Sequence, residues 1–529
     1  MKRLFTIICL CSCILAVNGQ ETYEIAELSR QDLNGTARYV GMGGAMDALG
    51  ADISTMSSNP AGIGLFRKSQ AAVSIGVVSQ NGNEFDNISP TRVSFDQAGM
   101  VFSVNTGFRK QSYLNFGFNY SKSRNFAQIL EASGNLFDSS QNRQTAGKGV
   151  SGIFEYGNSV NQVDYLYGQA GFIEEIKIGK DRYYNYYWDD GESYQMNRAV
   201  TGHTNNFDMN ISGNINNRVF LGITFGLKDV LYKAHSQYDE LLVPQYGSSS
   251  IYDSREISGS AFDVKFGAII RPIETSPFRI GLSVATPTWY RLRSSNYTDL
   301  IYTFKDVKTG KPARTQVMSE ESYRYRFSTP WNFGISLGHT FGTSVALGVC
   351  YNYADYSSTT ARIDDGYEYG YDYYGPYEYS VSHDDRTTND QISKTLKGVS
   401  TLKIGAEIKP TNEFAVRFGY NYVSPMYSEN GMKDPSVCSV GNYYMSQTDY
   451  TNWKATNRFT AGLGYTLDNF GLDLSYQYSC QKGDFYPFSN GSYYFYDDHD
   501  EYQEFDNSVA PCEVKNNRHQ VLMTLSYKF

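Results

Sequence analysis

The residue types that most often carry catalysis are scattered along this chain. An enzyme needs a nucleophile, a base and an orienting group that converge in one pocket. The six histidines show no such local grouping: His203, His235, His339, His383, His499 and His519. The stretch Gly147-Lys148-Gly149-Val150-Ser151-Gly152 matches a dinucleotide-binding pattern in its glycines, but it lacks the strand and helix on either side that such a site requires. We interpret it as a flexible glycine-rich stretch, and the sequence predicts no enzyme, no catalytic residue and no cofactor.

Two segments combine aromatic and acidic residues in a way that suits binding. Residues 364–390 interleave tyrosines with Asp and Glu, and residues 484–506 repeat the pattern. Aromatic rings offer a large contact area and lose little rotamer entropy. We therefore expect ligand capture on these loops, with the candidate residues Tyr373, Tyr374, Tyr493 and Tyr494; solvated loops with rings packed on one another are the alternative. The spacing of the carboxylates matches no EF-hand loop, so no metal site is predicted.

Composition limits the classes of protein that could present such loops. The 529 residues are 41% hydrophobic but 15% aromatic, with 46 Tyr and 48 Gly. No window beyond the first 20 residues is apolar enough for a membrane helix, and a formal charge of −9 argues against binding to nucleic acid. Abundant Tyr and Gly with weak, distributed hydrophobicity indicate β-structure that has one wet and one apolar face, as in a transmembrane β-barrel.

The N-terminus predicts export. Lys2 and Arg3 precede an apolar run from Leu4 to Val17, which is typical of a secretory signal peptide over residues 1–19 and too short for a membrane anchor. Four cysteines would remain in the mature chain: Cys350, Cys438, Cys480 and Cys512. Their spacing suggests no metal site. One disulfide among the last three is compatible with an oxidising compartment, without indicating which pair.

Period-two alternation dominates the sequence from residue 69 onward. In the last segment Val521, Met523, Leu525, Tyr527 and Phe529 fall on one face, and only Leu522 breaks the polarity of the other. Elsewhere the polar face carries charged residues such as Lys265, Arg279, Lys403 and Glu407, which in a barrel would line the lumen. Fourteen such segments can be counted: 69–80, 97–108, 112–123, 199–215, 217–232, 255–271, 277–293, 323–340, 343–357, 394–409, 412–424, 452–467, 469–480 and 517–529.

The connections between these segments alternate strictly between short and long. Tight turns such as Gly342 and Asp468 separate long connections such as 124–198 and 481–516. Outer-membrane barrels have short periplasmic turns and long outer loops, whereas a soluble β-sandwich has no reason for this segregation. The sequence therefore predicts an all-β, 14-stranded antiparallel transmembrane barrel over residues 69–529, in the outer membrane of a Gram-negative cell. Both termini would then lie on the periplasmic side, and Phe529 would be read by the barrel-assembly machinery.

Residues 20–68 differ from the rest because they lack a long strand and are rich in small residues. They include Gly41-Met42-Gly43-Gly44 and the turn signal Asn59-Pro60-Ala61. Small residues allow backbones to approach closely. We expect a compact hatch inside the lumen, with Gly41, Gly43, Gly44, Asn59, Pro60 and Ala61 as the hatch or gating residues; a periplasmic tail is the alternative.

At the level of motifs, the chain resembles the FadL/TodX family of outer-membrane transporters for hydrophobic compounds. The resemblance is carried by residues 35–45, by Asn59-Pro60-Ala61-Gly62 and by two proline motifs, residues 285–290 and 328–334. It implies a fourteen-strand barrel with an N-terminal hatch. It also implies that hydrophobic ligands are captured outside, enter the barrel and leave sideways into the membrane.

The functional prediction is uptake of hydrophobic small molecules such as long-chain fatty acids. The expected partners are that ligand, the lipid of the outer membrane and, through Phe529, the assembly machinery. A haem-capturing receptor and a structural or adhesive barrel are the alternatives. A polar-solute porin is disfavoured because residues 20–68 would occupy its lumen.

Overall fold

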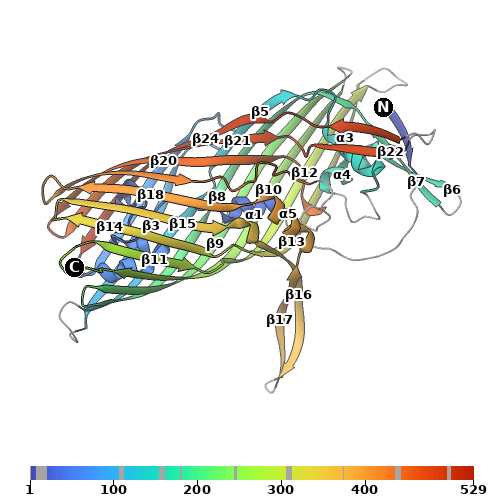
Figure 1. The fold of residues 1–529 in the computed structure, drawn as a ribbon. Coiled ribbons are helices and arrows are strands. Elements are labelled where there is room, and N and C mark those ends of the chain that lie inside the picture. The colour runs from blue at the N-terminus through green and yellow to red at the C-terminus, as the bar shows by residue number, and fades with distance from the viewer. Residues whose placement is uncertain are drawn as a thin grey trace.

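The computed structural model describes residues 2–6, 21–106, 112–153, 161–178, 181–243, 247–305, 312–372, 375–434, 443–496 and 502–529. Antiparallel strands close into a single barrel around residues 21–68 (Figure 1). The last strand pairs with the first from Gln70↔Lys528 to Gln80↔Arg518, which completes the circle. The chain passes along the barrel wall fourteen times, and we call each pass a stave. Five of the staves are interrupted, so the barrel comprises nineteen separate strands.

The bounds of the barrel strands follow the chain order. They are β2 Gln70–Gln80, β3 Thr91–Asn105, β4 Tyr113–Asn125, β5 Gln128–Asn135, β8 Asp190–Ile215, β9 Val219–Val243, β10 Gly247–Ile270, β11 Arg279–Ala285, β12 Trp289–Lys305, β13 Pro312–Ser328, β14 Asn332–Phe341, β15 Val345–Asp355, β16 Thr360–Asp372, β17 Gly375–Asp384, β18 Gly398–Ile408, β19 Phe414–Val423, β20 Tyr450–Leu467, β21 Phe470–Tyr486 and β24 Cys512–Lys528. Each of the fourteen predicted segments corresponds to one stave, and the predicted fold class is confirmed.

Two of the interruptions lie side by side and have a common cause. Pro287 separates β11 from β12, and Pro330 separates β13 from β14. Proline has no N–H to donate to a neighbouring strand. The Thr288 N–H instead donates to the Thr329 hydroxyl at 2.9 Å, which joins the two breaks across the wall.

The outer face of the wall is apolar and the inner face is polar. On β24, Val521, Met523, Leu525 and Tyr527 are exposed on the outside, as the alternation predicts. Leu522, which breaks the pattern, points inward and packs on Ala37 and Val40 of the N-terminal segment. Comparable rows of exposed apolar side chains continue around the wall and mark the part that faces lipid. No helix among the described residues is long and apolar enough to cross a membrane.

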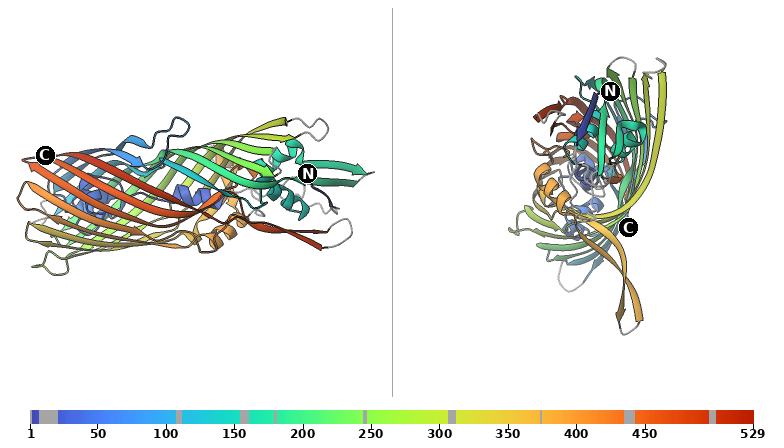
Figure 2. Two further views of the ribbon diagram at one scale, coloured as in Figure 1. Left: turned by 90° about the horizontal axis from the view of Figure 1, so that it is seen from above. Right: turned by 90° about the vertical axis from the view of Figure 1, so that its right-hand side faces the viewer.

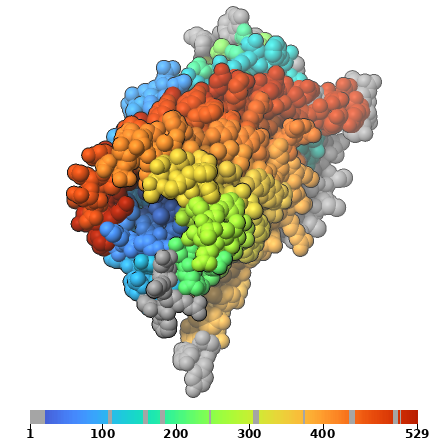
Figure 3. Space-filling view, turned by 60° about the vertical axis from the view of Figure 1, so that its left-hand side comes forward, coloured from blue at the N-terminus to red at the C-terminus, as the bar shows by residue number. Residues whose placement is uncertain are grey.

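The N-terminal segment fills the lumen. It contains the helices α1 Thr22–Ser29 and α2 Ala37–Gly41 and the 3-10 turns η1 Ile53–Ser57 and η2 Pro60–Leu65, and most of its residues are buried. Figure 2 shows these blue helices enclosed by the strands, and Figure 3 shows them filling the end of the barrel that holds the short turns. We call residues 21–68 the hatch.

The prediction that both termini lie at the end with the short turns is wrong for the N-terminal side. The hatch begins in the other half of the barrel, where Tyr23 donates a hydrogen bond to Asn452 at 2.9 Å. Apolar residues of α1, among them Ile25 and Leu28, join the hydrophobic core of this half, which explains the placement. Phe529 does lie at the end with the short turns (Figure 1).

Several long connections are folded rather than irregular. Those at the far end of the barrel contain α3 Gln141–Val150, α4 Gln162–Tyr167, the π-helical turn η3 Gly168–Phe172, β6 Ile173–Ile178, β7 Asp181–Trp188, β22 Gly491–Tyr496 and β23 Tyr502–Asn507. The N-terminal strand β1 Lys2–Thr6 pairs with β7. A buried ion pair between Lys148 and Asp164, 2.7 Å, ties α3 to α4. Cys480 and Cys512 are free and therefore not joined to each other, whereas Cys438 lies outside the described residues.

The acidic, tyrosine-rich segment 364–390 is also ordered. Most of it forms the hairpin of β16 and β17, which stands out from the wall across the long axis of the barrel (Figures 1 and 2). The 3-10 turn η4 Tyr356–Ser358 leads into this hairpin, and helix α5 Arg386–Thr395 returns the chain to the wall.

Candidate functional site

The glycines predicted as hatch residues lie where the hatch touches the wall most closely. Gly43 has a positive φ of 62°, and a Cβ there would lie 2.8 Å from the backbone nitrogen of Tyr420. A Cβ on Gly41 would lie 3.3 Å from the Cα of Gly462 on β20. Gly44 turns inward on the hatch itself, against Leu33 and Tyr39. These contacts leave no space for larger side chains at this side of the lumen.

The wall contributes matching glycines that sequence reasoning missed. A Cβ on Gly348 would lie 2.0 Å from the carbonyl oxygen of Ala45, and a Cβ on Gly405 would lie 2.3 Å from that of Met42. A Cβ on Gly419 would meet Gly43 at 2.1 Å. These glycines occupy neighbouring inward positions on three consecutive staves, β15, β18 and β19. Inward-facing glycines that pair with one another on neighbouring strands are the sequence signal that could have identified the part of the wall that contacts the hatch.

The Asn59-Pro60-Ala61 turn is fixed to the opposite part of the wall. The Asn59 side chain accepts a hydrogen bond from the backbone of Ala61 at 3.2 Å, and so caps η2. The Pro60 carbonyl accepts a hydrogen bond from the hydroxyl of Ser212 at 2.8 Å. Wall glycines again make room, because a Cβ on Gly267 would lie 2.1 Å from the amide oxygen of Asn59. Five of the six predicted hatch residues therefore lie against the wall, whereas Gly44 packs within the hatch.

Ion pairs attach the hatch to the wall as well. Glu407 accepts from Arg38 of the hatch at 3.0 Å and from Arg417 of β19 at 2.6 Å. Arg417 in turn donates to Asp473 at 2.6 Å. Lys403 pairs with Asp47 of the hatch at 3.4 Å. The inward placement predicted for Lys403 and Glu407 is confirmed, and each makes a bridge to the hatch.

A second network surrounds Asp32 in the hatch. Its carboxylate accepts from Arg124 at 2.8 Å and lies 3.5 Å from Arg518 and 4.0 Å from Arg458. Glu27 also pairs with Arg124. Burial alone would raise the pKa of Asp32, but the three guanidinium groups outweigh it and hold this pKa well below its usual range. The carboxylate is therefore charged throughout the physiological range of pH.

Acidification to about pH 5 is expected to leave the hatch in place. An Asp with a lowered folded-state pKa stabilises the protein above its unfolded pKa of about 3.9, and this contribution is lost only as pH falls through the lower, folded-state value. Barrels reconstituted in planar bilayers should therefore show the same low conductance at pH 7 and pH 5. A reversible rise in conductance between these two values would contradict the assigned charge state of this network.

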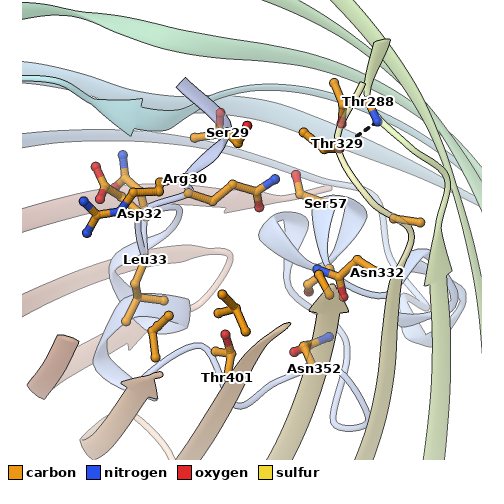
Figure 4. Close-up of a pocket in the computed structure, with 18 of the residues that line it drawn as sticks. Ser29, Arg30, Asp32, Leu33, Ser57, Thr288, Thr329, Asn332, Asn352 and Thr401 are labelled. Carbon is orange, nitrogen blue, oxygen red and sulfur yellow. Dashed lines mark hydrogen bonds between the residues drawn. The ribbon is translucent and has the colours of Figure 1, made fainter. Parts of the chain in front are cut away.

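A cavity of about 240 Å³ lies between the hatch and the wall (Figure 4). Its polar side includes Arg30, Asp32 and Ser57 of the hatch, together with Asn332 and Asn352 of the wall. Its apolar side is formed by the residues Ala285, Tyr290, Ala354, Tyr356, Val399, Val423, Met426, Tyr427 and Trp453. The cavity is thus amphipathic, with charged groups toward the hatch and aromatic groups toward the far half of the barrel.

Above this cavity, buried aromatic rings pack on one another inside the barrel. Tyr290 stacks on Phe327 with centroids 4.3 Å apart, and Tyr325 continues the stack at 6.4 Å from Phe327. Tyr23 of α1 stacks on Tyr427 at 5.1 Å. These rings belong to one large hydrophobic cluster that extends toward the outer loops. Packed aromatic side chains therefore occupy much of the lumen between this cavity and the outer loops.

The predicted capture residues differ in exposure. Tyr493 is only 3% exposed, so it does not offer the surface that was expected of it. Its ring packs over Gly147 of α3, where a Cβ would lie 2.4 Å from the ring. The segment 147–152, expected to be a flexible stretch, is thus largely helical, and its glycines admit aromatic rings. Tyr494 is exposed and stacks on Tyr502 at 5.5 Å; Tyr373 and Tyr374 lie outside the described residues.

The histidines take no part in this cavity. The five that the structure describes are absent from its lining. His203, His235 and His383 instead face the carboxylates of Asp229, Asp86 and Asp365. Within the described ranges, no group of three or more His, Cys, Asp or Glu side chains is arranged to hold a metal ion.

Comparison with known proteins gives a likeness of fold. No family model and no curated protein sequence matches the chain. Among solved structures, the toluene transporter TbuX of Ralstonia pickettii has a TM-score of 0.48 and 10% identity, and a FadL homologue of Pseudomonas aeruginosa has 0.48 and 12%. The toluene transporter TodX of P. putida has 0.46 and 12%. Each comparison covers 94% of this chain and 99% of the other. These three are solved structures of the FadL/TodX type that the sequence motifs resemble, and the likeness concerns the overall fold alone.

Proposed function

We propose that this protein is an outer-membrane transporter that takes up hydrophobic small molecules. The observation that carries the proposal is the amphipathic cavity, which is closed by the hatch on one side and by a cluster of packed aromatic side chains on the other. A water-filled porin does not need its lumen filled by aromatic side chains. An adhesin needs neither these side chains nor the cavity.

The chemistry of the cavity favours an amphipathic ligand with a long apolar part and an acidic head, such as a long-chain fatty acid. Burying apolar surface against the aromatic rings gains about 25 cal/mol per Å². Toward the hatch the cavity offers the cationic groups of Arg30, Lys403 and Arg458, each of which also faces a carboxylate of the hatch: Glu27, Asp47 and Asp32 in turn. The acidic head would face these cations, and the tail would lie along the Tyr290 side.

Transport into proteoliposomes tests the proposed function. Purified barrel should speed entry of oleate well above that of a disaccharide of similar mass, and lipid extraction of the purified protein should release fatty acids. Equal entry of both solutes would identify a general pore. Failure to accelerate either, with attachment to cells or polymers retained, would favour the adhesive alternative.

Capture at the outer end is part of the same proposal. Tyr494 and Tyr502 present a stacked, exposed pair of rings on the β22–β23 hairpin. Replacing both with Ser should lower oleate uptake about threefold at low concentration, since a modest apolar contact area is lost, and should matter little at saturation. Tyr165→Ser, which removes an exposed ring from α4, is the matched control. Unchanged uptake in the double variant would assign capture elsewhere.

Phe529 is proposed to direct assembly. Its backbone donates a hydrogen bond to Ser69 at 3.0 Å where β24 meets β2, and its ring lies against Tyr527 and Phe102 on the lipid side. Phe529→Ala should lower the yield of heat-modifiable, folded barrel without altering export across the inner membrane. Leu525→Ala is the control, because it removes another lipid-facing side chain from the same strand. Equal losses in the two variants would mean that Phe529 contributes only ordinary apolar surface.

A further inference from the structure

The lipid-facing band ends in tryptophans on one side of the barrel. Trp289 at the start of β12 and Trp331 just before β14 are each 49% exposed on the outside of the wall. Trp289 also stacks on Phe262 of β10 at 6.2 Å. Tryptophan is enriched where a membrane protein leaves the hydrocarbon and enters the headgroup layer. These rings mark the level of that boundary on the loop side of the barrel.

Four arginines lie directly beyond this boundary. Arg291 and Arg293 of β12 and Arg324 and Arg326 of β13 alternate with buried residues such as Tyr290 and Tyr325, so they point away from the lumen. The strand register places Arg291 opposite Arg326 and Arg293 opposite Arg324. Like charges in directly opposed positions destabilise a sheet unless an anion compensates them.

The pair Arg291 and Arg326 is compensated by a carboxylate of the protein itself. Asp364, at the root of the β16–β17 hairpin, lies 2.9 Å from Arg326 and 3.6 Å from Arg291. Arg291 also donates to the hydroxyl of Tyr367 at 2.7 Å and lies over its ring. The projecting hairpin thus begins at the level of the arginines, beside the lipid-facing surface.

The second pair has no such compensation. In the part of the chain that the structure describes, neither Arg293 nor Arg324 pairs with a carboxylate, and the Arg324 side chain makes no hydrogen bond. Arg293 donates only to the hydroxyl of Ser322 at 2.9 Å. Ser258 of β10 and Ser295 of β12 lie in neighbouring outward positions. The result is an exposed group of two guanidiniums and several hydroxyls in which neither guanidinium is paired with a carboxylate; the outward carboxylate of Glu256, opposite Ser295, pairs with Lys233 at 2.8 Å.

We propose that Arg293 and Arg324 bind the phosphate of a lipid headgroup in the outer leaflet. Guanidinium groups bind phosphate oxygens through paired, charge-assisted hydrogen bonds, and the serine hydroxyls can donate to the same group. A lipid is favoured over a soluble anion because the site is continuous with the apolar band, which places the acyl chains of that lipid below Trp289. This role is independent of the ligand that passes through the lumen.

Binding of a phosphorylated lipid by the intact barrel tests the proposal. The probe is bis-phosphorylated lipid A in detergent micelles, compared with the same lipid after removal of its phosphates, and the readout is bound lipid per barrel by native mass spectrometry. Wild-type protein should prefer the phosphorylated form. Arg293→Ser with Arg324→Ser should weaken that binding about tenfold, since hydrogen bonds to charged groups are lost. Arg293→Lys with Arg324→Lys should lie between, because lysine keeps the charge but not the paired geometry.

Lys482→Ser with Lys515→Ser is the matched control, because it removes two exposed cations from β21 and β24 on another part of the wall. This control should keep the wild-type preference, and heat-modifiability should show that all variants fold. Equal losses in the control, or no preference in wild-type protein, would overturn the proposal. Displacement of the lipid by millimolar inorganic phosphate would also overturn it, in favour of a site for a free anion.

Discussion

Deleting residues 20–64 is expected to convert a nearly closed barrel into a wide ion channel. The hatch contacts the wall through backbone-level packing at Gly41 and Gly43, and through the turn at Pro60. With the hatch removed, a fourteen-strand wall encloses more space than its inward side chains can fill, as in barrels of similar size that hold water. Single-channel conductance in planar bilayers should rise by at least about tenfold.

A point variant tests whether the ion pairs that attach the hatch to the wall are needed to keep the barrel closed. Asp32→Ala leaves Arg458 and Arg518 without their shared carboxylate in a buried site, and removing one partner of a buried ion pair typically costs about 3–5 kcal/mol. Conductance in this variant should rise in bursts as the hatch shifts. Glu131→Ala, at a carboxylate on β5 outside this network, is the control and should stay closed. A deletion variant that folds and conducts like the wild type would show that the hatch does not block the lumen.

The strands could be predicted from the sequence because each one obeys a local rule. A strand with lipid on one side and water or polar side chains on the other must alternate, and residues 520–528 of β24 and 470–479 of β21 do so with one exception. The inward apolar residue Leu522 is explained only by the structure of the hatch, because its partners Ala37 and Val40 are almost 500 residues away in the sequence. Local periodicity is therefore enough to predict the strands of the wall, whereas the packing inside the lumen depends on contacts between residues that are distant in the sequence.

The hatch residues were found for a related reason. Gly43 has a positive φ and a neighbour at 2.8 Å, so glycine is required by the backbone itself. The complementary wall glycines, such as Gly405 and Gly419, look like ordinary members of an alternating strand. Their role follows only from the register of neighbouring strands. The same holds for Glu407, whose inward face was predicted but whose two arginine partners were not.

The outer loops were the least predictable part. Their tyrosines have no lipid to face, so aromatic content alone does not separate a buried ring from an exposed one. Tyr493 and Tyr494 are adjacent, but only Tyr494 is exposed, because Gly147 of a distant helix receives the ring of Tyr493. Gly147 in one loop and Tyr493 in another thus form a single contact, which neither loop sequence predicts by itself.

Filling the cavity is expected to block uptake while leaving the barrel intact. Ala354, near the end of β15, points inward and lines the cavity on its apolar side. Replacing it with Trp would place an indole where the ligand's apolar part is proposed to lie. The empty space beside Ala354 would accept much of the ring, so the strain that usually follows overpacking, about 1–3 kcal/mol, should stay near the lower end of that range.

Oleate uptake into proteoliposomes should fall about tenfold in Ala354→Trp, the factor given by a loss of roughly 1.4 kcal/mol in binding. Leu347→Trp is the matched control, because Leu347 lies on the same strand but faces lipid. It should assemble and transport like the wild type. The low conductance of the closed barrel should persist in both variants, since neither change touches the contacts that pin the hatch. Normal uptake in a folded Ala354→Trp barrel would mean that hydrophobic ligands bypass this cavity, and the route would then have to leave the lumen above Tyr290.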